Sequence, residues 1–217
     1  MLKRPLPAAA RRAAGAALVL ALTFGAGLAA WAAQPPRMVL PDAPSRSLGR
    51  VSGLSLIEAI RDGDDVRAWA LIKAGADVNA VVFGDGSPLI AAAREGRLDL
   101  VTALVERGAR VGQAVPGDGD PLIAAAAGGY LDVVRYLVGR GANVNAEVHG
   151  DETPLINAAR SGSLPVVQYL VAEGADPSFA VMAPTVSGVV RRSPLGEARK
   201  HGRADIVAWL TSIGAKP

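Results

Sequence analysis

The sequence predicts an all-α fold, a solenoid of five helix-turn-helix units with projecting β-turn fingers. The first observation behind this prediction is internal repetition, because residues 82–114 and 115–147 are identical at 20 of 33 aligned positions. The second is a proline that recurs every 33 residues after a short polar side chain, and the third is a glycine that recurs at the same step. A 33-residue period is typical of stacked helical units rather than of a compact globule.

The composition limits both the fold and the chemistry. Of the 217 residues 50% are apolar, only 4% are aromatic, and none is Cys. This composition excludes a disordered chain, a disulfide scaffold and a cysteine-ligated metal site. Because large rings are scarce, we expect a thin core built from Leu, Val and Ala.

The first 32 residues have the pattern of a signal peptide. Residues 1–12 are basic, residues 13–33 are apolar apart from Thr23, and small residues precede a cleavage position beside Ala32 or Ala33. An uncleaved signal anchor is the alternative, because an apolar stretch of this length can span a bilayer. We therefore expect an exported, periplasmic protein. In the alternative, residues 13–33 anchor it in the inner membrane with the repeats outside the cytoplasm.

The leader also carries the excess positive charge. Its four basic residues leave 19 Lys and Arg against 20 Asp and Glu in the remainder, a net charge of about −1. A nucleic-acid partner is therefore not expected. Residues 33–51 contain four prolines and little apolar periodicity, so we predict a Pro-rich linker before a repeat domain at residues 52–217.

Each repeat begins with a predicted short inner helix. A Ser, Asp or Thr before the recurrent proline is typical of an N-cap followed by the first helical residue. A glycine eight residues after the proline closes the helix. The predicted N-caps are Ser87, Asp120, Thr153 and Ser193, and the closing glycines are Gly96, Gly129, Gly162 and Gly202.

A predicted outer helix follows in each repeat. Apolar residues recur in it at the spacing of one helical face, as at Leu98, Val101, Leu104 and Val105. Asp99 in its first turn complements the helix dipole. The glycines that end these helices are Gly108, Gly141, Gly174 and Gly214.

These segments resemble the ankyrin repeat. The family motif joins Thr-Pro-Leu-His, paired alanines, a Val-rich helix and Gly-Ala-Asp-Val-Asn, and this chain has Thr153-Pro154-Leu155 and Gly141-Ala142-Asn143-Val144-Asn145. The resemblance covers residues 52–217. It implies that the chain binds another protein through its concave face, which is formed by the finger tips and the C-terminal ends of the inner helices.

The chain departs from the family motif in two ways. The family's His is replaced by Ile90, Ile123, Ile156 and Gly196, so we expect apolar contacts where the family has a polar bridge. The finger reads Gly-Asp-x-x-Pro-Leu-Ile, which resembles ankyrin units appended to bacterial membrane metallopeptidases of the beta-lactam-sensing kind. The chain has no His-Glu-x-x-His metal motif, and it is identified as an ankyrin repeat protein of an exported, bacterial type.

The ends of the array deviate from the repeat. Seven extra residues lie within residues 180–192, and this insert is rich in valine. The insert is either a docking site or a flap that folds back over the end of the core. Trp69 and Trp209 lie on the first and last outer helices, where we expect them to cap the open core ends.

No catalytic or metal-binding pattern is present in the sequence. The two histidines, His149 and His201, belong to no metal-ligand spacing and to no nucleophile motif. We therefore expect no enzymatic activity, no metal and no cofactor. Asp85, Asp118 and Asp151 recur in the fingers, and we expect each carboxylate to bond its own turn, since one carboxylate is too few for calcium.

Positions that vary within the fixed frame are the candidates for partner contacts, although neutral surface drift produces the same variation. They are the finger tips Phe83, Pro116 and His149 and the inner-helix ends Arg94, Glu95, Arg160, Ser161, Lys200 and His201. The partner is expected to be another protein, and membrane contact is expected only through an uncleaved leader. The alternatives are a structural protein that self-associates through the insert and a membrane-anchored scaffold or regulator.

Overall fold

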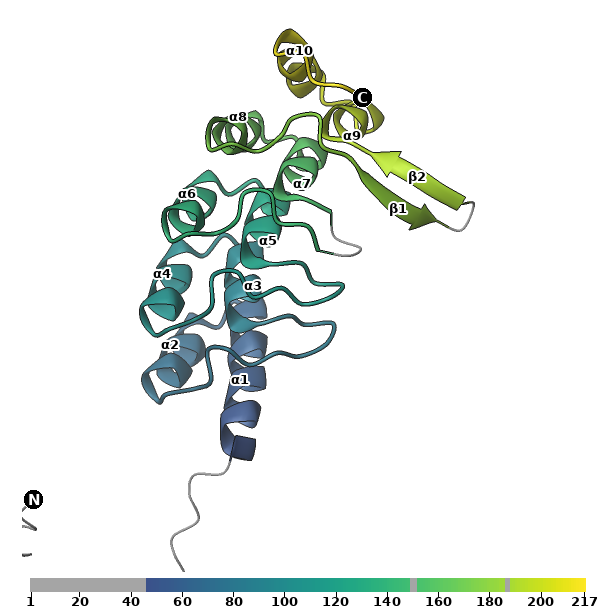
Figure 1. The fold of residues 1–217 in the computed structure, drawn as a ribbon. Coiled ribbons are helices and arrows are strands. Elements are labelled where there is room, and N and C mark those ends of the chain that lie inside the picture. Colours follow the sequence, from purple (N-terminus) through teal and green to yellow (C-terminus); the bar gives the residue numbers. More distant parts are fainter. Residues whose placement is uncertain (1–45, 149–151, 186–187) are drawn as a thin grey trace, which may run out of the picture. The chain divides into compact units, whose positions relative to one another are not determined.

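The computed structural model describes residues 46–148, 152–185 and 188–217 (Figure 1). The predicted signal peptide and most of the predicted linker therefore lie outside the described residues. None of the helices in these described ranges is long and apolar enough to cross a bilayer. The described residues belong to one compact unit, and the description below concerns that unit.

Helices of this unit alternate between an inner and an outer layer (Figure 1). Each inner helix packs against the outer helix that follows it and against the inner helices of the neighbouring repeats. This arrangement confirms the predicted helix-turn-helix solenoid. The inner helices are α1 (Arg46–Arg61), α3 (Pro88–Arg94), α5 (Pro121–Gly128), α7 (Pro154–Ser161) and α9 (Pro194–Lys200). The outer helices are α2 (Asp65–Lys73), α4 (Leu98–Glu106), α6 (Leu131–Gly139), α8 (Leu164–Ala172) and α10 (Ala204–Ser212).

The inner helices begin where the sequence predicts. The side chains of Ser87, Asp120, Thr153 and Ser193 each accept a hydrogen bond from the backbone N–H three residues later, and a proline follows each of them as the first helical residue. The first inner helix differs, because α1 begins at Arg46, within the segment predicted as linker. Helix therefore extends six residues before the predicted start of the repeat domain.

The core is thin and aliphatic, as the composition predicts. The inner helices bury continuous runs such as Leu89 to Ala93, and Ile90, Ile123 and Ile156 are all buried at the position of the family's His. On the outer helices the buried stripe differs from the predicted one. Leu98 is 37% exposed because it is the first residue of α4 and lies at the edge of the packed layer. Val101 and Leu104 are buried as predicted, and Leu100 is buried in place of Leu98; the equivalent residues of α6 and α8 are buried too.

The two tryptophans do not behave alike. Trp209 on α10 is partly buried and packs against the core, as expected of a capping residue. Trp69 on α2 is 41% exposed, so its role as a cap of the core stays a prediction. Ala68 and Ile72 supply the buried face of α2, and Trp69 lies next to that face rather than on it.

The insert forms a β-hairpin that projects on the side of the fingers (Figure 1). Strands β1 (Val181–Thr185) and β2 (Gly188–Arg192) are antiparallel, with Val181 paired to Arg192 and Thr185 to Gly188. Val181 is buried, whereas Met182 and Val189 are 65% and 62% exposed. Apart from Val181, the exposed apolar residues of the insert, Met182, Val189 and Val190, do not fold back over the core, and that alternative is wrong.

Candidate functional site

Fingers precede the inner helices and expose their tips. Backbone pairs Val82 with Gly86 and Val115 with Gly119 form isolated antiparallel bridges that hold the first two fingers. The tip residue Phe83 is 83% exposed, and Pro116 at the equivalent position is also exposed. An apolar ring exposed to this extent gains free energy when a partner covers it. His149, the third predicted tip, lies outside the described residues.

The predicted contact residues at the inner-helix ends divide into two groups. Arg94, Glu95, Lys200 and His201 are exposed. Ser161 is partly buried, and its hydroxyl lies within hydrogen-bond distance of the carbonyl oxygens of Ala126 and Ala158. Because that hydroxyl already bonds the backbone of its own and the preceding inner helix, Ser161 holds the two helices together.

The finger carboxylates do not bond their own turns, so that prediction is wrong for both described fingers. The Oδ2 atom of Asp118 accepts a hydrogen bond of 3.1 Å from the N–H of Gly84, which belongs to the preceding finger. The Oδ1 atom of Asp118 lies 3.6 Å from Nη2 of Arg94. Asp85 pairs with Arg61. These carboxylates therefore couple fingers to each other and to the inner helices. Asp151 lies outside the described residues.

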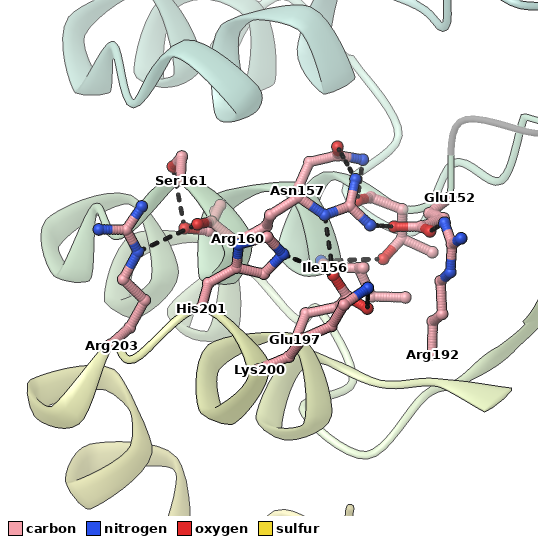
Figure 2. Close-up of polar contacts among 12 residues, drawn as sticks. Glu152, Ile156, Asn157, Arg160, Ser161, Arg192, Glu197, Lys200, His201 and Arg203 are labelled. Atoms are coloured by element: carbon pink, nitrogen blue, oxygen red, sulfur yellow. Dashed lines mark hydrogen bonds and ion pairs between the residues drawn. The ribbon is translucent and has the colours of Figure 1, made fainter. Parts of the chain in front are cut away.

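Arg160 lies at the centre of a polar network near the last repeat (Figure 2). Its Nε donates to Oε2 of Glu197 at 2.9 Å, and its Nη2 pairs with Glu152. Glu152 also pairs with Arg192 at the end of β2. Both carboxylates are nearly inaccessible, with side-chain exposures of 3% and 5%. The network therefore joins the third finger, α7, the hairpin and α9.

The α9 residues predicted to contact a partner also reach this network. Nζ of Lys200 lies 3.9 Å from Oε1 of Glu197, and Nε2 of His201 lies 3.4 Å from Oε2 of the same residue (Figure 2). Nε of Arg203 donates to the carbonyl oxygen of Arg160 at 3.1 Å. Arg160 is thus mainly a connecting residue of the fold, since its charge is compensated within the chain.

The pKa of Glu197 lies below its ordinary value of 4.5. Burial of the carboxyl group acts in the opposite direction and raises the pKa. The hydrogen bond from Arg160 and the positive charges of Arg160, Lys200 and Arg192 together outweigh burial. The folded protein therefore keeps Glu197 ionised at neutral pH.

A cavity of about 340 Å³ lies on the inner-helix side of the array, around the C-terminal half of α5. Ala127 and Gly128 of α5 line it, and Arg94 of α3 and Arg160 of α7 lie at its opposite sides. Asp118 and Asn157 are its other polar lining residues. The sequence alone does not predict this cavity, because the cavity forms only where three adjacent inner helices pack side by side.

The described residues contain no group of three or more His, Cys, Asp or Glu side chains that is arranged to hold a metal ion. His201, which directly follows α9, contacts Glu197 one turn earlier. The finger tips and inner-helix ends present an exposed ring, guanidinium groups and a small cavity. These features suit noncovalent binding.

Comparison with known proteins agrees with the geometry. Residues 56–148 and 114–181 match the sequence pattern described as ankyrin repeats (three copies), and together these matches span more than half of the chain. No curated protein matches the chain significantly. Ankyrin repeats are protein-protein interaction modules. With its 33-residue period, paired helices and fingers, the chain belongs to the ankyrin repeat family.

Proposed function

We propose that this chain is an exported protein that binds another protein through the concave face of its ankyrin array, in a bacterial envelope. The observation that carries the proposal is the exposure of Phe83 at 83% on a finger tip, together with exposed Arg94 and Glu95 at an inner-helix end. Aromatic rings and arginines are enriched at the energetic centres of protein interfaces. Two or three neighbouring repeats offer the area of a standard interface, about 800 Å² per partner.

Site-specific photo-crosslinking in living cells tests the binding face. A photoreactive residue is placed separately at Phe83 and Glu95, and at Val66 as the control on outer helix α2, where Val66 is 84% exposed. We expect one recurrent adduct from positions 83 and 95 and none from position 66. An adduct from position 66 alone contradicts binding through the concave face. Arg160 is not used, because the reporter there disrupts the network that joins α7 to α9.

Export has its own test. The basic, apolar and small-residue order of the leader and the absence of Cys support export. We expect intact-mass spectrometry of the envelope fraction to find a chain that begins next to Ala32 or Ala33. A full-length chain that stays in the inner membrane supports the anchored alternative instead. A chain recovered from the cytoplasm contradicts export.

A second candidate function, self-association through the hairpin, is favoured by the exposure of Met182 and Val189 at 65% and 62%. An exposed strand edge with apolar side chains is a template for pairing with another copy. We expect sedimentation at increasing concentration to show dimers that Val189→Glu abolishes. A monomer at every concentration contradicts this candidate and leaves the concave face as the binding surface.

A further inference from the structure

Basic side chains recur at the ends of the inner helices and are interrupted once. Arg61, Arg94 and Arg160 fit a step of 33 residues, but the position between the last two is Ala127. Arg61 pairs with Asp85, and Arg94 lies 3.6 Å from Asp118, so each of these arginines reaches the aspartate 24 residues later. Ala127 is too short to reach the next finger in this way. The array therefore lacks one long side chain in its middle repeat.

The cavity of about 340 Å³ lies at this interruption. Ala127 and the adjacent Gly128 replace the Arg94–Glu95 and Arg160–Ser161 pairs of the neighbouring repeats. The two flanking arginines remain and line the cavity from either side. Because neither residue of the middle repeat has a long side chain, the space between the guanidinium groups is left open on the concave face.

The cavity lining has more guanidinium groups than carboxylates, although the charge of Arg160 is compensated by Glu152 and Glu197 outside the lining. It contains two guanidinium groups and one carboxylate, that of Asp118, whose side chain is only 6% exposed. Asp118 is already occupied, since it accepts the hydrogen bond from Gly84 and lies beside Arg94. Arg160 is also engaged, because its nitrogens contact Glu152, Asn157 and Glu197.

Arg94 has hydrogen-bond donors available to a bound side chain. Its side chain is 41% exposed, and a single nitrogen, Nη2, makes both its contacts with Asp118, one to the carboxylate and one to the carbonyl oxygen at 3.3 Å. Within the described residues, Nε and Nη1 of Arg94 make no hydrogen bond. A guanidinium with two unused donor nitrogens binds a carboxylate more strongly than it binds a neutral acceptor. The difference in binding free energy increases where water is partly excluded.

We propose that this cavity receives an acidic side chain, Asp or Glu, of the partner protein, with Arg94 as its contact residue. The inference rests on the proposed function, because the cavity opens on the concave face. Arg160 forms the opposite wall, where its charge is already compensated by Glu152 and Glu197. Ala127 and Gly128 determine access, since any long side chain at either position fills the space.

Selection of peptides on the full chain tests the inference. Phage that display random twelve-residue peptides are selected on the immobilised protein, and synthetic copies of the selected peptides are titrated by fluorescence anisotropy. We expect the peptides to share one Asp or Glu, and replacement of that residue by Asn or Gln to weaken binding about tenfold. Arg94→Gln should remove this difference, so that the acidic and amide peptides bind equally.

A second variant tests the same cavity without removing a charged contact. Ala127→Arg restores the pattern of the neighbouring repeats and fills the space, so we expect at least a tenfold loss of binding with an unchanged circular dichroism spectrum. Arg110→Gln is the matched control, because Arg110 is an exposed arginine outside the cavity. This control should bind the selected peptides as the native protein does.

The outcomes separate the inference from the proposed function. If the peptides share no acidic residue but Ala127→Arg abolishes their binding, the acidic specificity is wrong and the concave face remains the binding surface. If neither Ala127→Arg nor Phe83→Ala changes binding, or if no peptide is selected, the inference and the proposed function both fail. The inference is also overturned if replacing the acidic residue of the peptide weakens binding equally to the native protein and to Arg94→Gln.

Discussion

Among the N-cap residues of the inner helices, Asp120 differs from the others in charge. The other repeats use neutral Ser87, Thr153 and Ser193, whereas Asp120 places a carboxylate where only 4% of the residue is exposed. Burial raises the pKa of Asp120, although the backbone N–H groups of Ile123 and Leu122 lower it in part. The carboxylate therefore caps α5 with a hydrogen bond of 2.7 Å and opposes folding through its charge.

We predict that Asp120→Ser stabilises the protein at pH 7. The folded pKa of Asp120 lies above its ordinary value of 3.8, so the protonated form is the one that folding favours. That contribution is fully present below pH 3.8 and is lost as the pH rises through the folded pKa. The gain in the free energy of unfolding should therefore be largest at neutral pH and shrink towards pH 4, as measured by urea titration.

Ser87→Asp provides the reverse control, because Ser87 is the equivalent N-cap and is 1% exposed. It should lower the free energy of unfolding at pH 7 and lower it less near pH 4. Equal stability of the native protein and Asp120→Ser at every pH contradicts the argument from burial.

Glu152 combines backbone strain with electrostatic bonding. It has φ of 66°, and it is the one residue other than glycine with positive φ among the described residues. Gly86 and Gly119 occupy the equivalent finger position with φ of 79° and 75°. A side chain in this left-handed region costs about 1 kcal/mol. Pairing of the Glu152 carboxylate with Arg160 and Arg192 offsets this cost.

We predict that Glu152→Ala lowers the free energy of unfolding more than Glu152→Gly does, by about 1 kcal/mol. Both changes remove the ion pairs, but only alanine keeps the strained φ. Both variants should be less stable than the native protein, because Arg192 loses its carboxylate partner and Arg160 loses one of its two. Thermal unfolding of the three proteins measures the difference, and equal stability of the two variants shows that the φ of residue 152 carries no strain.

At the scale of elements, the network around Arg160 determines how the hairpin and the last repeat attach to the array. Glu152 closes the third finger, Arg192 ends β2 and Glu197 lies on α9. A two-stranded hairpin is marginally stable by itself. The ion pair of Arg192 with Glu152 therefore fixes the base of the hairpin, while Arg160 joins α7 to α9.

We predict that Arg160→Gln lowers the free energy of unfolding at pH 7 by roughly 2 kcal/mol. This is less than the 3–5 kcal/mol typical of a broken buried pair, because Arg160 is 32% exposed. The lowered pKa of Glu197 contributes stability above its ordinary value of 4.5, and this stability is lost as the pH falls through the folded pKa. The deficit of the variant should therefore decrease below pH 4.5.

The matched control for this prediction is Arg110→Gln, an exposed arginine outside the network. Its stability should remain within about 0.5 kcal/mol of the native value at every pH. Chemical denaturation between pH 3.5 and 7 measures both variants. A constant deficit of Arg160→Gln across this range contradicts a role for ionised Glu197.

At the scale of the whole molecule, the array transmits stability only between neighbours. Inner helix α7 packs against α5 and α9, and outer helix α8 packs against α6 and α10. Such an array behaves as a chain of repeats whose stability is the sum of the units and their interfaces.

We predict that deletion of residues 194–217 reduces amide hydrogen-exchange protection in α7 and α8 and leaves α2 and α4 nearly unchanged. The deletion removes Leu195, Ile206 and Leu210 from the core and leaves Arg160 without Glu197. Hydrogen exchange with mass spectrometry measures protection along the chain. An equal loss of protection in all helices contradicts nearest-neighbour coupling.

The sequence by itself determined the repeat, the starts of the inner helices that begin with proline, and the composition of the core. These features depend on short-range physics: Gly196 donates its N–H to Ser193 three residues away, and Gly141, with φ of 89°, adopts the left-handed conformation that follows a helix end. Such signals are complete within one repeat. The same is true of the buried isoleucines at the position of the family's His, whose apolar character predicts their environment.

The tertiary structure alone decided which partners the charged residues have and where the surface is hollow. Asp118 bonds a finger 34 residues earlier, and Arg160 contacts a glutamate 37 residues later, so neither pair follows from local spacing. From the sequence, the valine-rich insert was either a docking site or a flap over the core. Strand pairing forms a projecting hairpin and excludes the flap. The cavity arises because helices from three repeats pack side by side, and a missing side chain at Ala127 has physical meaning only between the arginines that flank it.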